Sequence, residues 1–212
     1  MPFFREINPA GGIRTGIWRI TETADELLAM IQLNDPELII LGKFGHEMRK
    51  KQWLACRVLL KHMLSPLNTC LTYDLNGKPH LDSGSHRVSV SHSGEFAAVV
   101  CSENRSVGID IEKIKDRVER VKDRFLREDE LKNISTDNRL EQLYIFWGGK
   151  EALYKLHGKP DVDFRKDIHI HPFDYLCNTN QTCSAALMLY DTRKDYTLFY
   201  EKIDGYMLVV AF

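Results

Sequence analysis

The 212-residue chain is 43% hydrophobic and 28% charged and has a formal net charge of −1 at pH 7, which excludes the global basic field typical of nucleic-acid-binding proteins. Its length suits one large domain or two small lobes. No apolar run approaches a signal-peptide core or the roughly 18 residues of a membrane span. The five cysteines, an odd number without a CxxC pair, indicate reduced thiols. We therefore expect a soluble cytoplasmic protein that binds neither nucleic acid nor membrane.

The first part of the chain predicts one strand and two helices. The strand covers 16–20, and the first helix runs to Leu33. Its N-terminus is expected at one of two capping pairs, Thr21 with Glu22 or Thr23 with Glu26. A long second helix is predicted for 43–64 and ends before Pro66.

A series of short strands is expected next. Asn76-Gly77 is a hairpin-turn signal between 72–75 and 78–81. The alternating valines Val88 and Val90 lead into 91–94 (SHSG), which we predict to be a turn. The strands expected after it are 96–101 and 107–112.

The second half of the chain has a similar order of elements. The highly charged stretch 113–140 predicts an amphipathic helix, a turn and a short helix near 128–132. A long helix follows over 140–157 and ends at Gly158. The four strands expected after this helix are 168–170, 183–190, 196–202 and 206–212.

The two long helices align with each other, Trp53 with Trp147 and Lys61 with Lys155. Each half therefore pairs a long helix with a small antiparallel sheet. This pattern favours an α+β fold of pseudo-two-fold duplicated lobes, 1–104 and 105–212, that form a single catalytic unit. The cleft between such lobes is the expected ligand site.

Two acidic residues alternate on the predicted strand 107–112 (VGIDIE). Alternate residues of a strand point to the same side, so Asp110 and Glu112 face one way and Ile109 and Ile111 the other. A buried pair of carboxylates without a cation would be costly, and a bound metal would remove that cost. The alternative is an edge strand with an acidic face in solvent.

A charged face recurs on the predicted helix at 147–155 (WGGKEALYK). Trp147, Lys150, Glu151, Tyr154 and Lys155 follow helical spacing and are expected on one face. The alternative is an exposed face with an ordinary Glu–Lys pair. Two glycines inside a helix are unfavourable, so close approach of a ligand or strand is expected there.

Three carboxylates with two lysines beside them would form a site with hard oxygen ligands and adjacent cations. Such a site suits Mg²⁺ and a phosphate-bearing ligand. Attack on a pyrophosphate requires neutralised charge on its oxygens and a base for the attacking hydroxyl, and these groups supply both.

Other polar clusters have ordinary interpretations. Ser91 and His92 suit a turn, and no GxSxG motif supports a Ser-His-Asp triad. His169 and His171 would point to one side of a strand, as a zinc pair does, but packing is favoured because no third ligand has a convincing spacing. Lys78 after the hairpin turn is also compatible with a solvated lysine.

Four motifs stand in the order and spacing of the 4′-phosphopantetheinyl transferases, which the chain resembles. They are 77–79 (GKP), 89–94 (SVSHSG), 108–112 (GIDIE) and 147–155 (WxxKEAxxK). The similarity is close over 43–160, and the chain length resembles that of the surfactin-type, pseudo-dimeric monomers. The two glycines after Trp147 depart from the family's usual residues.

The resemblance implies that the protein moves the phosphopantetheine arm of coenzyme A onto a serine of an apo acyl or peptidyl carrier protein and releases adenosine 3′,5′-bisphosphate. The carrier would belong to fatty acid, polyketide or nonribosomal peptide biosynthesis. The alternatives are a non-catalytic coenzyme A-binding homologue and a Mg²⁺-dependent phosphohydrolase.

The resemblance also implies roles for individual residues. Asp110, Glu112 and Glu151 match the family's magnesium ligands, with Mn²⁺ as another possible ion. Glu151 matches the residue that activates the serine, and Lys155 the lysine that assists the leaving group. Contacts to coenzyme A are expected from Lys43, Arg49, Arg57, Lys78, Pro79, Ser91, His92 and Lys150. The segment 113–133, with Phe125 and Glu130, resembles the part of the family that lies near the carrier protein.

Overall fold

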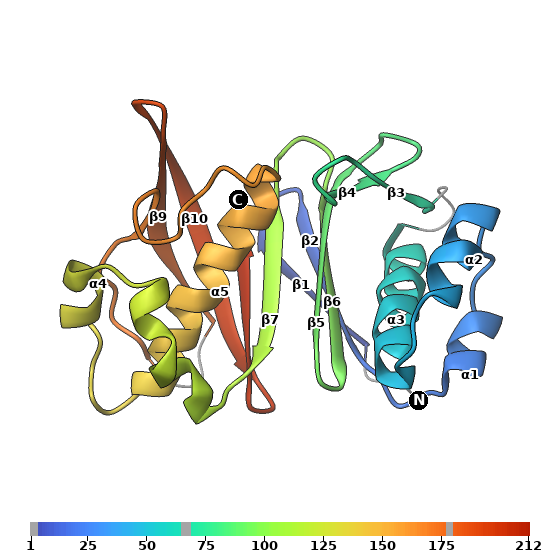
Figure 1. Cartoon of the computed structure of the whole chain (residues 1–212), viewed down its shortest axis with the longest axis horizontal. Coiled ribbons are helices and arrows are strands. Elements are labelled where there is room, and N and C mark those ends of the chain that lie inside the picture. The colour runs from blue at the N-terminus through green and yellow to red at the C-terminus, as the bar shows by residue number, and fades with distance from the viewer. Residues whose placement is uncertain (1–3, 65–68, 177–179) are drawn as a thin grey trace. The chain divides into compact units, whose positions relative to one another are not determined.

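In the computed structural model, which describes residues 4–64, 69–176 and 180–212, the elements divide between two units, Met1–Ser106 and Val107–Phe212. Both units combine helices with antiparallel sheets, so the predicted α+β fold class is confirmed (Figure 1). None of the helices in these described ranges has the length and hydropathy needed to cross a membrane.

The first unit is built on a four-stranded antiparallel sheet in the order β1-β2-β6-β5. Its long helix, α3, packs on β2, β5 and β6. At Gly16 of β2 the helix comes so close that an added Cβ would lie 2.5 Å from Met63 Sδ. The elements of this sheet and of a separate hairpin are β1 (Phe4–Ala10), β2 (Ile13–Arg19), α3 (Glu47–Leu64), β3 (Leu71–Tyr73), β4 (Pro79–Leu81), β5 (Arg87–Ser93) and β6 (Phe96–Ser102).

The first predicted helix is present but short. α1 (Ala24–Ala29) begins at Thr23, which forms a capping box with Glu26 and confirms the second of the two predicted caps. The helix ends at Ala29 and does not reach Leu33.

The start of the long helix was predicted wrongly. A separate helix, α2 (Asp35–Gly42), begins at Asn34 through a capping box with Glu37. Lys43 is the C-terminal cap of α2, and α3 begins only at Glu47. Pro66, which was predicted to end α3, lies outside the described residues.

The two turns of this region had different outcomes. The Asn76-Gly77 turn is confirmed: Gly77 has a φ of 81°, and the Asp74 carboxylate accepts a hydrogen bond of 2.9 Å from the Asn76 backbone. The turn predicted at 91–94 is wrong, because β5 continues through Ser93 in register with β6. The chain turns instead at Gly94, with a φ of 52°.

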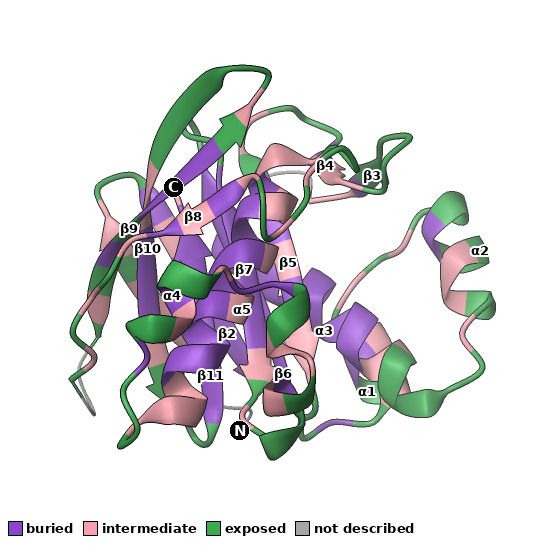
Figure 2. Cartoon of the chain, turned by 60° about the vertical axis from the view of Figure 1, so that its left-hand side comes forward, coloured by how far each residue is buried: buried purple, intermediate pink, exposed green. Residues whose placement is uncertain are grey.

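The second unit holds a five-stranded antiparallel sheet in the order β7-β11-β10-β9-β8. The long helix α5 lies across it and contacts β7 and β11 most extensively (Figure 1). Buried residues concentrate on α5 and on the strands beneath it (Figure 2). These elements are β7 (Gly108–Lys113), α5 (Arg139–His157), β8 (Ile168–Ile170), β9 (Gln181–Leu189), β10 (Thr192–Ile203) and β11 (Tyr206–Ala211), and they confirm the helix and all four strands predicted after it.

Three glycines allow α5 to approach this sheet. A Cβ on Gly108 would overlap the backbone carbonyl of Ala152. On the helix, a Cβ on Gly148 would lie 2.9 Å from Val209, and one on Gly149 would lie 2.7 Å from Leu198. The predicted reason for the Gly148-Gly149 pair, close approach of a strand, is therefore confirmed.

The segment between β7 and α5 differs from its prediction. Its first part forms two short 3₁₀ helices, η1 (Asp116–Arg120) and η2 (Lys122–Arg124), and no amphipathic α-helix. The short helix near 128–132 is confirmed as α4 (Glu128–Lys132).

Candidate active site

Strand β7, at one edge of the five-stranded sheet, carries the two predicted carboxylates. β7 pairs with β11 on one edge and lies under α5, so Ile109 and Ile111 are fully buried. Asp110 is buried and Glu112 is half-buried. The alternation predicted from the sequence therefore places both acids under the helix, close to its charged residues.

Helix α5 adds a third carboxylate and a lysine to this pair. Lys155 Nζ donates hydrogen bonds of 2.7 Å to Asp110 Oδ1 and 3.0 Å to the Ile109 carbonyl. Burial raises the pKa of the Glu151 carboxyl, the negative charges of Asp110 and Glu112 raise it further, and Lys155 lowers it. These four residues, Asp110, Glu112, Glu151 and Lys155, are called the carboxylate cluster below.

The carboxylate cluster contains an excess of negative charge and is partly balanced by cations. Lys155 pairs with Asp110, and Arg117 of η1 lies 3.6 Å from a Glu112 carboxylate oxygen. Among the side chains that the structure describes, no group of three His, Cys, Asp or Glu is arranged to hold a metal ion. The donor set itself, three carboxylates with the pKa of Glu151 raised, suits a hard divalent cation.

Lys150 occupies a different environment from the one predicted. It is fully buried, and its Nζ donates to Glu130 Oε2 at 2.7 Å, to the Phe164 carbonyl at 2.8 Å and to the Ile168 carbonyl at 3.0 Å. Burial lowers the pKa of Lys150, while Glu130 opposes that shift. The structure therefore does not bring Lys150 into the carboxylate cluster.

The predicted charged face of α5 is thus divided into two rows. Glu151 and Lys155 point toward β7, whereas Trp147 and Tyr154 pack on Phe164, with ring centroids 5.9 and 5.7 Å apart. Lys150 belongs to this second row through its bond to the Phe164 carbonyl.

Glu130 and Phe125, which were associated with the carrier-protein segment, are buried. Glu130 accepts hydrogen bonds of 2.9 Å from the backbone N–H groups of Arg127 and Ile170 as well as the one from Lys150. The Phe125 ring packs edge-on against Trp147 at 5.1 Å. Both side chains support the second unit from inside.

In the first unit, two of the predicted ligand contacts meet. Arg49 of α3 is exposed, and its guanidinium contacts both ring nitrogens of His92 on β5. Ser91, the neighbour of His92, is buried. An exposed guanidinium beside an imidazole can bind an anion such as a phosphate.

Three further residues of the first unit were predicted to contact coenzyme A: Lys43, Lys78 and Pro79. Lys43 is exposed at the end of α2, and Pro79 begins β4. Lys78 is half-buried, and burial lowers the pKa of its ammonium group while Asp74 opposes the shift.

Arg57 takes part in an internal network. It is buried, its Nε donates to Glu37 Oε1 at 2.9 Å, and its guanidinium stacks 3.2 Å from the centre of the Trp53 ring. Nη2 also donates to the Tyr73 hydroxyl at 3.1 Å. The Glu37 partner was not predicted, because α2 itself was missed.

The remaining histidine pair is involved in packing contacts. The rings of His169 and His171 lie 5.0 Å apart, and His169 Nε2 lies 3.1 Å from an Asp129 oxygen. These contacts agree with the packing interpretation of the His-x-His sequence.

Residues 106–210 match the family model described as the 4′-phosphopantetheinyl transferase superfamily. The second unit of the chain is therefore similar to this superfamily. The match contains β7, α5 and the whole carboxylate cluster, so it confirms the predicted resemblance at the superfamily level.

Curated relatives carry the same enzyme name. The 4′-phosphopantetheinyl transferase AcpT of Escherichia coli K12 is 34% identical over 119 residues, which cover 52% of this chain and 59% of the relative. AcpT of Salmonella typhimurium LT2 is 34% identical over 125 residues, 56% of this chain and 65% of the relative. The 4′-phosphopantetheinyl transferase gsp of Aneurinibacillus migulanus is 34% identical over 87 residues, 39% of this chain and 35% of the relative. The matches thus span about three fifths of the length of the AcpT relatives.

Proposed function

We propose that this protein is a 4′-phosphopantetheinyl transferase that moves the phosphopantetheine arm of coenzyme A to a serine of an apo acyl or peptidyl carrier protein and releases adenosine 3′,5′-bisphosphate. The observation that supports this most strongly is the carboxylate cluster, which lies inside the residues that match the transferase superfamily. The names of the curated relatives point to the same reaction.

Asp110, Glu112 and Glu151 would hold a Mg²⁺ ion, with Mn²⁺ as a possible substitute. When bound, such an ion neutralises charge on the pyrophosphate oxygens. Binding to Asp110 and Glu112 requires that the ion compete with Lys155 and Arg117, which pair with these carboxylates in the structure.

Glu151 is the proposed general base. Its raised pKa makes its carboxylate a better proton acceptor than an ordinary glutamate, so it can take the proton of the attacking serine hydroxyl. Lys155, held by Asp110 and the Ile109 carbonyl, would place a positive charge beside the bisphosphate leaving group.

Coenzyme A would also contact residues of the first unit. Arg49 supplies an exposed guanidinium for a phosphate, with His92 beside it, and Lys43, Lys78, Pro79 and Ser91 are further proposed contacts. We assign Arg57 and Lys150 supporting roles, because their cationic groups bind Glu37 and Glu130 inside the protein. In this assignment they hold α3 and α5 in place and do not bind phosphate directly.

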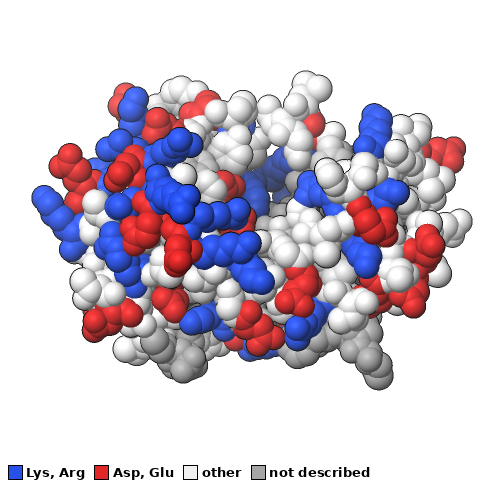
Figure 3. Space-filling model, turned by 60° about the horizontal axis from the view of Figure 1, so that its bottom comes forward, with Lys and Arg blue, Asp and Glu red and all other residues white. Residues whose placement is uncertain are grey.

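The surface of the segment 113–133 is the proposed docking site for the carrier protein. Its exposed residues include both bases and acids, among them Lys115, Arg120 and Glu128. Figure 3 shows Lys and Arg interspersed with Asp and Glu on one face of the protein. A docking surface of this kind would recognise a carrier through several complementary charges.

We also propose that the chain is a surfactin-type monomer composed of duplicated lobes, because each unit has one long helix packed on an antiparallel sheet. We further propose a cytoplasmic location, which is compatible with the cysteines that form no disulfide bond among the described residues. These are Cys56, Cys70, Cys101 and Cys183, while Cys177 lies outside the described ranges.

Intact-mass spectrometry of an apo carrier protein, incubated with this protein, coenzyme A and Mg²⁺, tests the proposed reaction. We expect a mass gain equal to one phosphopantetheine arm that disappears when EDTA is added. Consumption of coenzyme A without carrier modification would indicate a phosphohydrolase. Binding of coenzyme A with neither result on several carriers would indicate a non-catalytic homologue.

A further inference from the structure

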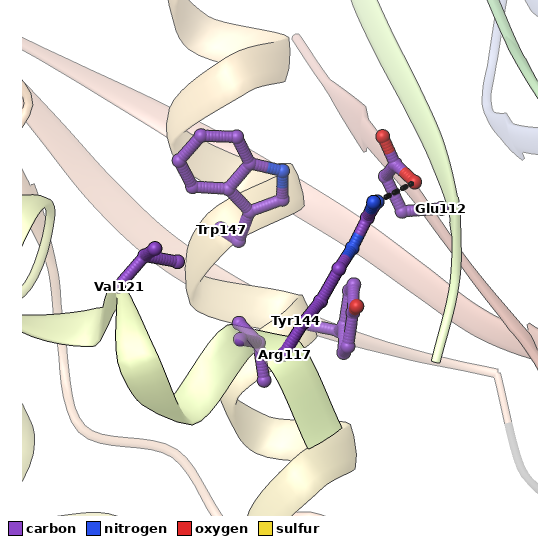
Figure 4. Close-up of a pocket in the computed structure, with 6 residues that line it drawn as sticks. Glu112, Arg117, Val121, Tyr144 and Trp147 are labelled. Carbon is purple, nitrogen blue, oxygen red and sulfur yellow. Dashed lines mark ion pairs between the residues drawn. The ribbon is translucent and has the colours of Figure 1, made fainter. Parts of the chain in front are cut away.

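A pocket opens beside the carboxylate cluster in the second unit. Its volume is about 280 Å³, and it is lined by Glu112, Arg117, Val118, Val121, Tyr144 and Trp147. Figure 4 shows Arg117 extending from η1 past Tyr144 toward Glu112, with Trp147 and Val121 on the opposite wall. The walls are therefore apolar and aromatic, and the formal charges of the lining belong to the Glu112–Arg117 pair.

The ion pair between Glu112 and Arg117 is long and solvent-exposed, so little free energy is needed to break it. The Arg117 side chain is 65% exposed, and its Nη2 lies 3.6 Å from Glu112 Oε2. Exposed ion pairs of this kind contribute little free energy, because water and salt compete for both groups. The neighbouring Lys155–Asp110 pair is shorter, at 2.7 Å, and far less exposed.

Glu112 is also one of the carboxylates proposed to hold the divalent cation. A guanidinium and a divalent cation beside the same carboxylate repel each other, so both cannot keep their closest positions there. Because Arg117 forms the wall of the pocket opposite Trp147, release of this ion pair would also widen the pocket in front of Trp147.

We propose that Arg117 is a displaceable counter-ion that narrows the pocket in front of Trp147 until a divalent cation takes its place on Glu112. The proposal rests on the metal site of the proposed function. The freed Arg117 side chain turns into solvent, so cation binding and access to the pocket are coupled. Arg117 then lowers the affinity of the protein for the cation.

The first part of the test measures Mg²⁺ affinity by isothermal titration calorimetry without coenzyme A. Arg117→Ala is expected to tighten Mg²⁺ binding about two- to fivefold, the factor that an exposed ion pair typically represents. The matched control is Arg120→Ala, which removes the same charge from an exposed position of the same 3₁₀ helix. This control should change the affinity less than Arg117→Ala does.

The second part measures acrylamide quenching of Trp147 fluorescence, obtained as the difference between each protein and its Trp147→Phe version. Trp18 and Trp53 are buried, which favours Trp147 as the responsive residue. Mg²⁺ should increase quenching in the wild type, whereas Arg117→Ala should show the higher quenching before Mg²⁺ is added.

Equal Mg²⁺ affinity in the wild type and Arg117→Ala, or the same gain in Arg120→Ala, would overturn this proposal alone, because the proposed function is tested separately by carrier loading with the wild-type protein. Quenching of the wild type that does not respond to Mg²⁺ would also overturn it. Absence of Mg²⁺ binding from all variants would overturn the proposal together with the metal site.

Discussion

Two lysines on α5, five residues apart, each form a 2.7 Å ion pair with a carboxylate, but in opposite surroundings. The Lys150–Glu130 pair has no exposed side-chain surface, whereas Lys155 is 29% exposed beside Asp110. Lys150 donates hydrogen bonds to Glu130 and to two backbone carbonyls, and these bonds join α5 to α4 and β8. Lys155 remains partly open to solvent among three carboxylates. The two lysines therefore differ in burial, and not in charge or helical spacing, which favours a structural role for Lys150 and the proposed chemical role for Lys155.

The largest effect on activity is expected at Glu151, the proposed general base, which lies with Lys155 in the row of α5 that points toward β7. Glu151→Gln keeps the shape of the side chain but removes the proton acceptor, so kcat for carrier loading should fall by about 10²–10⁴. Circular dichroism should show an intact fold. Near-normal loading by this variant would remove Glu151 from its proposed role.

The buried pair should dominate stability. Lys150→Met leaves Glu130 buried without its cation and should lower the free energy of unfolding by about 3–5 kcal/mol. Lys155→Met, the matched substitution on the same helix, should lower it by less than Lys150→Met does, because the Lys155 side chain is 29% exposed and water already screens its pair with Asp110. Denaturant unfolding of both variants measures the difference, and equal losses would contradict the comparison.

A double variant measures how much of the stability lost in Lys150→Met comes from the unpaired charge of Glu130. Lys150→Met with Glu130→Leu removes both charges, so it should recover part of the stability lost by Lys150→Met alone. Recovery should be incomplete, because Glu130 also accepts hydrogen bonds from the backbone N–H groups of Arg127 and Ile170. Full recovery in denaturant unfolding would show that these two hydrogen bonds contribute nothing.

The smallest expected effect is the pH dependence of stability at Glu151. The pKa of this carboxyl is raised by folding, so its ionisation opposes folding above its ordinary pKa. Glu151→Gln should therefore be more stable than the wild type at neutral pH. The advantage should vanish as the pH falls below the ordinary glutamate value, where both states are protonated. Thermal unfolding in a pH series measures this difference, and a constant difference would argue against the raised pKa.

Sequence periodicity was sufficient to identify the carboxylate cluster. The period of two on β7 placed Asp110 and Glu112 on one side, and helical spacing added Glu151 and Lys155. The same spacing also grouped Lys150 with them. Helical spacing alone cannot tell which residues of a broad face contact one neighbouring element and which contact another, because that depends on the packing partners. Those partners, Glu130 and the carbonyls of Phe164 and Ile168, are distant in sequence and carry no shared pattern.

Other errors have equally local causes. Lys43 was placed on the long helix because the capping box of Asn34 with Glu37 was not recognised. This capping box starts a separate helix, α2, which ends with Lys43 as its C-terminal cap. The serines and histidine of 91–93 have turn-like composition, but tertiary pairing with β6 keeps them in a strand. Arg117 was missed, because its reach to Glu112 depends on the 3₁₀ geometry of η1.

The central claim is that Lys155 acts in the reaction whereas Lys150 only supports the fold. The most direct test is steady-state carrier loading by Lys150→Met and Lys155→Met, measured side by side at a temperature where both are folded. Lys155→Met should lose about 10²–10³ in kcat, the usual effect of removing one charge-stabilising group. Lys150→Met should keep most of its kcat despite its lower stability. The opposite order, with folded Lys150→Met the less active enzyme, would show that Lys150 acts in the chemistry and would contradict the account.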